Sequence, residues 1–201
     1  MIPNFPPHFC VIGTDTDVGK TYVTRWLAQQ LRTTRRVITQ KWVQTGCTAA
    51  IPADIQAHGI APLGDTRRYP YHFAYPASPH LAARLAGKQV DPAYIHQCFR
   101  SLAHDYDTVI CEGAGGLFVP LTDDYLLLHC IQDLNLPSVL VVANKLGCIN
   151  HAMLTLDALR SRNLALHAII MNRIDTTQDI VLTDENTRII RHLSQVPVIS
   201  L

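Results

Sequence analysis

The chain has 201 residues, enough for one large domain or at most two small ones. Hydrophobic residues make up 48% of it, and 17 lysines and arginines nearly balance 16 aspartates and glutamates. This composition excludes a disordered chain, and the lack of any basic run argues against nucleic acid as a partner.

The cysteines and the first residues bear on where the protein works. The six cysteines are scattered without a C-x-x-C pair, which indicates reduced, buried thiols in a cytoplasmic protein. Residues 1–9 contain three prolines and lack the basic and apolar regions of a signal peptide. The longest apolar runs, such as 138–143, are too short to cross a bilayer, so no membrane contact is expected.

Short apolar runs alternate with longer amphipathic stretches, and no linker or repeat interrupts them. Such alternation predicts one α/β domain over residues 1–201, with a mostly parallel sheet covered by helices on both faces. Ser78 and Asp91 each stand before a proline, a pattern typical of a helix start. In chain order the predicted elements are strand 8–13, helix 19–32, strand 36–41, helix 53–60, helix 79–86, helix 92–104, strand 107–112, helix 122–134, strand 138–144, helix 150–162, strand 167–172, helix 180–193 and strand 196–201.

The turn after the first predicted strand reads GTDTDVGKT, residues 13–21. It resembles the phosphate loop G-x-x-x-x-G-K-[ST], but its first glycine, Gly13, comes one residue early. A glycine turn that enters a helix presents backbone N–H groups to an anion; Lys20 would add a charge, and Thr21 a hydroxyl for Mg²⁺. An ordinary strand–turn–helix with a surface lysine is the alternative. The context favours a P-loop NTPase-like fold.

Other predicted strands also end in polar residues, and ligands of open parallel sheets bind at that edge. Glu112 follows the apolar run 109–111 and is placed to hold Mg²⁺, although a turn glutamate would look the same. The glycines after it let a phosphate approach the backbone. Lys41 either neutralises phosphoryl charge or snorkels to the surface. Asp54 either binds metal or caps a helix.

Taken together, these segments resemble the dethiobiotin synthetases, the ATP-dependent enzymes of biotin synthesis. The family has G-T-D-T-x-V-G-K-T, K-P-V-x-[ST]-G, P-x-S-P-H and E-G-A-G-G. The matching segments here, over about residues 8–201, are GTDTDVGKT, Lys41–Gly46 (KWVQTG), Pro76–His80 (PASPH), Glu112–Gly116 and the run 145–155, KLGCINHAMLT.

The resemblance implies a reaction and a site. One amine of 7,8-diaminopelargonate takes up CO₂, the carbamate attacks the γ-phosphate of ATP, and the second amine closes the ureido ring and expels phosphate. Lys41 and Lys20 would be the catalytic cations, and Asn172 would read the adenine edge. The expected nucleotide and metal-site residues are Asp17, Val18, Gly19, Lys20, Thr21, Tyr22, Asp54, Glu112, Gly113, Ala114, Gly115, Asn172 and Arg173, of which Thr21, Asp54 and Glu112 would hold Mg²⁺.

For the substrate, the resemblance implies contacts from Thr45 and, across a homodimer interface, from a helix start at Gly147, Cys148 and Asn150. The alternative function is a P-loop regulatory or partitioning ATPase that acts through a protein partner. The balanced charge and the KLGCINHAMLT run argue against that alternative.

The chain departs from the family pattern at four positions. Asp17 stands where glutamate is common, Trp42 replaces a proline, Thr45 replaces a common serine, and Arg173 stands where aspartate is frequent. Asp17 keeps the carboxylate on a shorter side chain, and Trp42 is expected to reshape the loop after Lys41.

Overall fold

The computed structural model describes residues 4–175 and 177–201. Its centre is a six-stranded sheet, and every paired neighbour in it is parallel. The strand order is β2-β5-β1-β6-β7-β8. The strands are β1 (His8–Gly13), β2 (Val37–Lys41), β5 (Thr108–Gly116), β6 (Ser138–Ala143), β7 (Leu166–Asn172) and β8 (Val198–Ser200). The predicted parallel sheet is confirmed.

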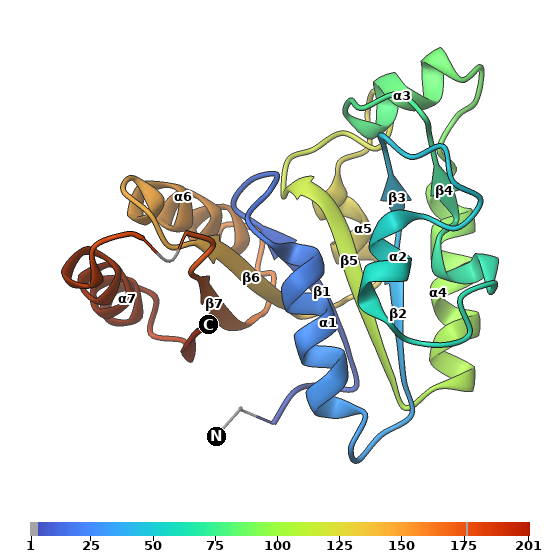
Figure 1. The fold of residues 1–201 in the computed structure, drawn as a ribbon. Coiled ribbons are helices and arrows are strands. Elements are labelled where there is room, and N and C mark those ends of the chain that lie inside the picture. The colour runs from blue at the N-terminus through green and yellow to red at the C-terminus, as the bar shows by residue number, and fades with distance from the viewer. Residues whose placement is uncertain (1–3, 176) are drawn as a thin grey trace.

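Helices cover both faces of this sheet (Figure 1). α1 and α2 lie in front of β1, β5 and β2 in that view, whereas α5 lies behind β5. Each helix described here is too short or too polar to cross a membrane. The helices are α1 (Lys20–Leu31), α2 (Ala53–His58), α3 (Pro79–Leu85), α4 (Pro92–Asp105), α5 (Leu127–Asp133), α6 (Cys148–Arg160) and α7 (Ile180–Ser194), with a 3₁₀ turn η1 (Thr66–Arg68).

The core lies between the sheet and these helices. Strands covered on both faces bury every side chain, which explains why they read as unbroken apolar runs. All six residues of β6 are buried, for example. One cluster of buried side chains crosses the sheet through Ile38, Ile110, Val11, Val141 and Ile170.

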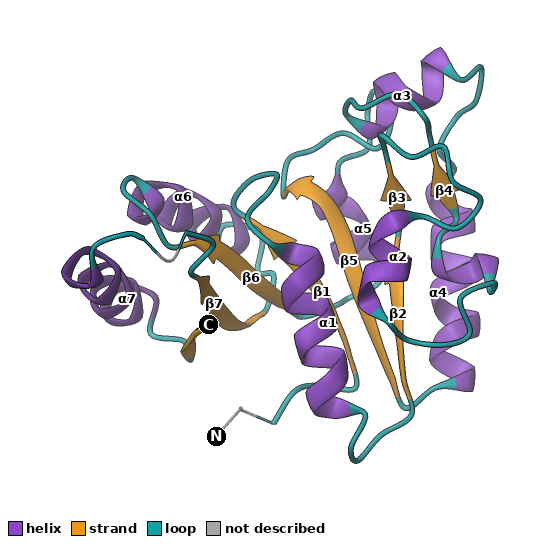
Figure 2. Ribbon diagram, viewed as in Figure 1, coloured by secondary structure: helices purple, strands orange, loops and turns teal. Residues whose placement is uncertain are grey.

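A second, two-stranded sheet stands beyond the carboxyl end of β2 (Figure 2). It pairs β3 (Val43–Gln44) with β4 (Tyr71–His72) in parallel. This small sheet was not predicted from the sequence. Two-residue strands are too short to show a period, so no pattern marks them.

Two predicted segments differ from the structure. The helix predicted over 122–134 begins only at Leu127, because the chain before it forms a loop closed by a bridge between Pro120 and Leu126. The glycine segment after Glu112 continues β5 instead of leaving it as a loop. A Cβ at Gly113 would meet Leu127 at 2.7 Å, so glycine lets the strand pass close to α5.

The two proline-preceded helix starts are both present. Asp91 caps α4, since its side chain accepts a hydrogen bond from the Ala93 N–H at 2.9 Å. Ser78 precedes α3 but makes no side-chain cap bond.

Candidate active site

The site lies at the carboxyl ends of β2, β5 and β1, which are neighbours in the sheet. The chain leaves β1 toward β2 on one side and later returns to form β6 on the other, so β1 borders a topological switch point. Figure 2 shows the loops after β1 and β5 next to each other at this edge. Residues distant in sequence therefore meet here.

The loop of residues 13–21 is held tightly against the sheet. Gly19 has φ of +88°, and a Cβ there would clash with the Asn172 amide. That amide donates a hydrogen bond to the Val18 carbonyl at 3.0 Å. Lys20 Nζ donates to the Asp15 carbonyl at 2.7 Å. The loop thus enters α1 with a fixed turn that only glycine tolerates at Gly19.

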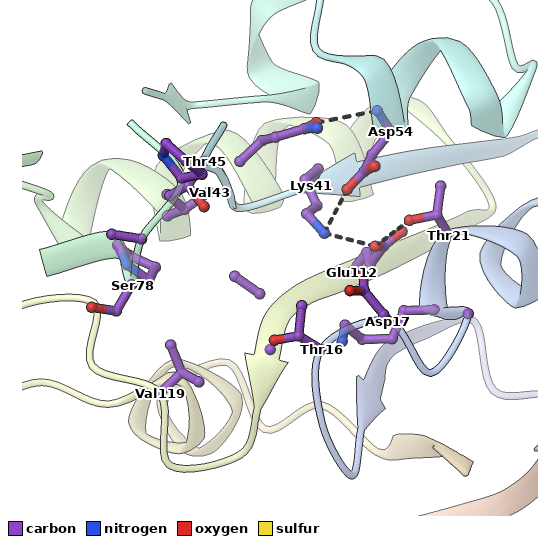
Figure 3. Close-up of a pocket in the computed structure, with 18 residues that line it drawn as sticks. Thr16, Asp17, Thr21, Lys41, Val43, Thr45, Asp54, Ser78, Glu112 and Val119 are labelled. Atoms are coloured by element: carbon purple, nitrogen blue, oxygen red, sulfur yellow. Dashed lines mark hydrogen bonds and ion pairs between the residues drawn. The ribbon is translucent and has the colours of Figure 1, made fainter. Parts of the chain in front are cut away.

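A buried ion cluster faces this loop (Figure 3). Lys41 Nζ lies 2.7 Å from Glu112 Oε1 and 2.8 Å from Asp54 Oδ2. The Thr21 hydroxyl donates to the same Glu112 Oε1 at 2.9 Å. We call Lys20, Thr21, Lys41, Asp54 and Glu112 the charged cluster. It unites residues from four elements, α1, β2, α2 and β5.

The ionisation of these groups follows from their contacts. Burial favours a neutral Glu112, but the Lys41 charge and a His58 hydrogen bond outweigh burial and hold the pKa of Glu112 well below its ordinary value. Burial also opposes charge on Lys41, yet Glu112 and Asp54 raise its pKa. For Lys20 the nearby carboxylates compensate only in part: burial, with repulsion from Lys41, lowers its pKa to about 8.

The charged cluster forms one wall of a cavity of about 600 Å³. Thr45, Ser78 and Val119 lie across this cavity from Thr21 and Glu112 (Figure 3). One wall therefore carries charge, and the opposite wall carries hydroxyl and apolar groups. The lining residues are Thr16, Asp17, Gly19, Lys20, Thr21, Lys41, Val43, Gln44, Thr45, Asp54, Pro76, Ala77, Ser78, Pro79, Glu112, Ala114, Gly115 and Val119.

The oxygen atoms of the cluster suit magnesium. Mg²⁺ is bound in proteins by one or two carboxylates, with phosphate and water completing its shell. Thr21, Asp54 and Glu112 offer one hydroxyl and two carboxylates around the Lys41 ammonium, so this position already attracts a cation. Within residues 4–175 and 177–201, no group of three or more His, Cys, Asp or Glu side chains is placed to hold a metal by itself. The donor set fits an ion shared with a phosphate.

Several residues expected in the site lie apart from the cavity. Tyr22 is 58% exposed on α1 and stands outside the cavity lining. Gly113 packs against Leu127, although its carbonyl accepts a bond from Lys41 at 3.3 Å. Asn172 is buried behind the loop, and Arg173 donates to the Gln178 carbonyl at 2.9 Å.

The helix start expected to bind substrate lies on the other side of the loop of residues 13–21. Gly147, with φ of +88°, precedes α6. Cys148 lines a separate hollow of about 240 Å³ together with residues 14–18. Asn150 is exposed. Within one chain this group is therefore separated from Thr45.

Three polar groups of the site were not predicted from the sequence. His58 is fully buried and lies 2.7 Å from Glu112, Ser78 lines the cavity, and the Gln44 side chain accepts from the Asp54 N–H at 3.2 Å. A signal for His58 was available, since it follows Asp54 by four residues and that spacing puts both on one helix face.

Trp42, the residue in place of the family's proline, is fully buried. Its indole N–H donates to Gln40 Oε1 at 3.1 Å, and its backbone N–H, which proline lacks, faces the Glu112 carbonyl at 3.4 Å. The replacement thus ties the segment after Lys41 to β5.

Comparison with known proteins agrees with this geometry. A model of an AAA domain family matches residues 8–200. The chain is 37% identical to ATP-dependent dethiobiotin synthetase BioD 2 of Pasteurella multocida, over 93% of this chain and 91% of the relative. The chain belongs to the ATP-dependent dethiobiotin synthetase family. A BioD of Lysinibacillus sphaericus is 43% identical over 82% of this chain and 75% of the relative.

Solved structures outside the dethiobiotin synthetases share the fold. A ParA family ATPase from Chlorobium tepidum superimposes with a TM-score of 0.59 at 16% identity, covering 96% of this chain and 83% of the other. The MinC:MinD complex of Aquifex aeolicus gives 0.58 at 15% identity, covering 96% and 79%. At such identities the likeness concerns the P-loop NTPase fold alone, whereas the sequence relatives identify the family.

Proposed function

We propose that this protein joins CO₂ to 7,8-diaminopelargonate at the expense of ATP and closes the ureido ring of dethiobiotin. The observation that carries the proposal is the charged cluster. It places the buried Lys41 and two carboxylates beside the end of the phosphate loop, in one cavity. The family relationship supplies the substrates. Phosphoryl transfer depends mainly on positioning and charge neutralisation, and the cluster offers both.

The residues of the loop 13–21 bind the ATP phosphates. Asp17, Gly19 and Lys20 line the cavity, and Gly19 begins α1, so backbone N–H groups and the helix dipole favour an anion there. Lys20 exchanges the Asp15 carbonyl for a phosphate oxygen. The adenine lies toward the end of β7, near Asn172 and Arg173, as the family pattern predicts.

Thr21, Asp54 and Glu112 would hold Mg²⁺ together with the phosphates. The carboxylates of Asp54 and Glu112 both contact the Lys41 ammonium, so they already point toward one positive charge. The ion would neutralise charge on the phosphate oxygens. Lys41, freed from part of its pairing, points its ammonium at the carbamate and the γ-phosphate and stabilises the negative charge that develops between them.

The opposite wall of the cavity receives the diamine. Thr45 and Ser78 offer hydroxyls to the carbamate or amines, while Val43 and Val119 contact the methylene chain. The α6 start at Gly147, Cys148 and Asn150 serves the carboxylate tail bound in a second protomer, which accounts for its distance from Thr45 in one chain. We infer a homodimer whose subunits each work as one domain. The six buried free thiols suit a reducing cytoplasm.

A product assay tests the proposal. Purified protein is mixed with MgATP, bicarbonate and 7,8-diaminopelargonate, and ADP and dethiobiotin are followed by chromatography and mass spectrometry. We expect equal amounts of both products and little ADP without the diamine. ATP hydrolysis that ignores the diamine and yields no dethiobiotin would instead favour a regulatory or partitioning ATPase.

A further inference from the structure

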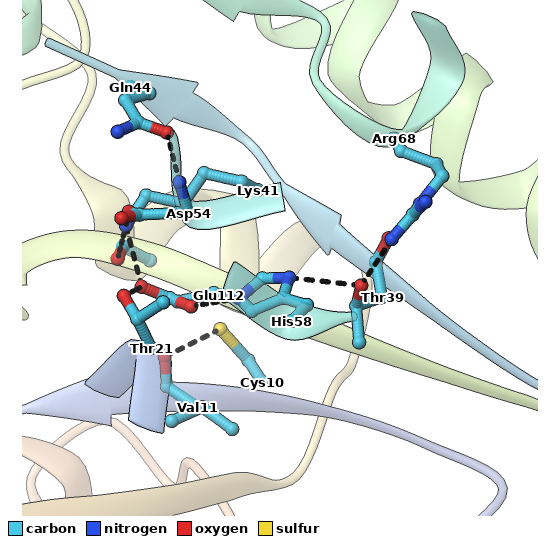
Figure 4. Close-up of polar contacts among 11 residues, drawn as sticks. Cys10, Val11, Thr21, Thr39, Lys41, Gln44, Asp54, His58, Arg68 and Glu112 are labelled. Carbon is cyan, nitrogen blue, oxygen red and sulfur yellow. Dashed lines mark hydrogen bonds and ion pairs between the residues drawn. The ribbon is translucent and has the colours of Figure 1, made fainter. Parts of the chain in front are cut away.

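His58, which the sequence analysis left unassigned, makes a buried contact with the charged cluster (Figure 4). It is the last residue of α2 and is fully buried. Its Nε2 lies 2.7 Å from Glu112 Oε2, and its Nδ1 lies 3.0 Å from the Thr39 hydroxyl. The two oxygens of Glu112 thus have separate partners, because Oε1 contacts Thr21 and Lys41.

Behind His58 stands a buried arginine. Arg68 donates from Nη2 to Thr39 Oγ1 at 2.7 Å and from Nε to the Thr39 carbonyl at 3.0 Å. Its Nη1 donates to the carbonyls of Ile60 and Pro62, both at 2.6 Å. These four acceptors are neutral oxygens, and they fix the guanidinium rigidly in one plane.

The direction of each hydrogen bond in this chain can be assigned by elimination. A guanidinium only donates, so Thr39 Oγ1 accepts from Arg68 and has its own O–H left to donate. An ionised carboxylate only accepts, so His58 Nε2 carries a proton and donates it to Glu112. We assign the remaining bond as Thr39 O–H donating to Nδ1, which makes the ring the tautomer protonated at Nε2 alone. Arg68 thus sets the tautomer of His58 through two successive hydrogen bonds.

The orientation of Glu112 depends on such a partner. The terminal torsion of a glutamate side chain is broad, so a carboxylate held at one oxygen can still turn. With Oε2 held by His58, Oε1 stays directed toward Thr21 and Lys41. Groups that orient metal-binding side chains in this way commonly change metal affinity by about 10- to 100-fold when they are removed.

We propose that His58 is a positioning residue for Glu112, and that the chain Arg68–Thr39–His58 fixes its tautomer so that Glu112 presents Oε1 to the metal and phosphate site. The consequence for Mg²⁺ rests on the proposed function, whereas the tautomer and the carboxylate contact do not. His58 itself does not touch the cavity, since Glu112 lies between them.

The tautomer can be tested without turnover. The metal-free protein is labelled with ¹⁵N-histidine, and long-range ¹H–¹⁵N spectra assign each ring nitrogen, with the His58→Gln variant identifying the His58 signals. We expect a neutral ring protonated at Nε2. In Thr39→Val the hydroxyl link is lost, and we expect this signature to disappear. A ring protonated at Nδ1, or at both nitrogens, in the unaltered protein would overturn the chain.

The effect on the metal site is tested with two matched variants. His58→Gln keeps an N–H near the Nε2 position, whereas His58→Asn can reach only the Thr39 side. Mn²⁺ binding to the ADP complex, measured from the electron paramagnetic resonance of the free ion, should weaken about tenfold or more in His58→Asn and much less in His58→Gln. Steady-state kinetics should show the same difference as a higher Mg²⁺ requirement, with a smaller change in kcat.

Controls separate positioning from simple loss of stability. Thr24 is fully buried, and its hydroxyl has no hydrogen-bond partner within the part of the chain that the structure describes, so Thr24→Val matches Thr39→Val in shape. We expect Thr24→Val to bind Mn²⁺ normally. Equal weakening in His58→Asn and His58→Gln, at equal melting temperatures, would remove the positioning role. Normal metal binding without dethiobiotin formation in the unaltered protein would contradict the proposed function instead.

Discussion

The two halves of the same sheet edge carry different kinds of polar group. At the ends of β1, β2 and β5 stands the charged cluster, with Lys41 between two carboxylates. Beyond the end of β6 stands a buried network of neutral groups: Asn144 Nδ2 donates to the Thr183 carbonyl and the Thr187 hydroxyl at 3.0 and 3.2 Å. Asn186 donates to Asn144 Oδ1 at 3.1 Å. We call Asn144, Thr183, Asn186 and Thr187 the amide cluster.

The difference indicates that the charged cluster serves the reaction and the amide cluster supports the fold. A neutral amide network satisfies its own donors and acceptors, and its burial costs little once it is complete. It joins β6 to α7 and leaves no charge for a ligand. The charged cluster instead holds several charged side chains, which can exchange their present partners for substrate phosphates and a metal ion. We therefore expect substitutions in the charged cluster to reduce turnover and those in the amide cluster to reduce stability.

The largest effect is expected for Lys41→Met. Removing the ammonium takes away the cation that faces the developing charge, and we expect kcat to fall at least 100-fold, about 2.7 kcal/mol in the barrier. Steady-state assays of ADP and dethiobiotin measure it, with melting curves to establish folding. Lys88→Met, at an exposed lysine, is the matched control. A folded Lys41→Met variant with an unchanged rate would remove Lys41 from the catalytic residues.

Lys20 should make nucleotide binding depend on pH. Its pKa is lowered to about 8, so its charge is present below that pH and is lost as the pH rises through it. In the absence of metal, we expect ADP affinity to fall by about tenfold between pH 7 and pH 9.5, the size of one charge-assisted hydrogen bond. Lys20→Arg, which stays charged, should flatten the profile in calorimetric titrations. An identical slope in both proteins would contradict this assignment.

The amide cluster should show the opposite behaviour. Asn144→Ala removes the bonds that Asn144 makes to the Thr183 carbonyl, the Thr187 hydroxyl and the Asn186 amide, and we expect a loss of about 1–3 kcal/mol in the free energy of unfolding. Urea denaturation measures that loss, and kcat at saturating substrates should stay within about twofold. A large fall in kcat with stability unchanged would erase the distinction between the two clusters.

Asn172 connects the two halves and should have the smallest effect. Its amide holds the Val18 carbonyl, so Asn172→Ala should weaken ATP binding by about 1 kcal/mol through the loop. Comparing ATP with inosine triphosphate separates this role from base recognition. Support of the loop predicts equal losses for both nucleotides; a loss confined to ATP would show that Asn172 reads the adenine edge.

The sequence predicted the parts that depend on local pattern. Apolar runs mark β1, β6, β7 and the first half of β5, and the rule that ligands bind at carboxyl strand ends brought Lys41, Glu112 and the loop of residues 13–21 to one edge. The small β3–β4 sheet and the continuation of β5 through its glycines were missed, because short pairings and backbone packing leave no periodic signal. His58 was missed because it ends a short helix instead of following a strand, so the rule for strand ends does not single it out; its four-residue spacing from Asp54 was the available signal.

In the proposed reaction, the γ-phosphate of ATP passes to an oxygen of the substrate carbamate. Single-turnover reactions with ¹⁸O-labelled bicarbonate, analysed by mass spectrometry before label exchanges with water, test it directly. The carbamate keeps two labelled oxygens; one bonds to phosphorus, and its bond to carbon breaks when the ring closes. We predict one ¹⁸O in each phosphate released and one in the ureido carbonyl of dethiobiotin. Unlabelled phosphate, with its new oxygen from water, would contradict the account.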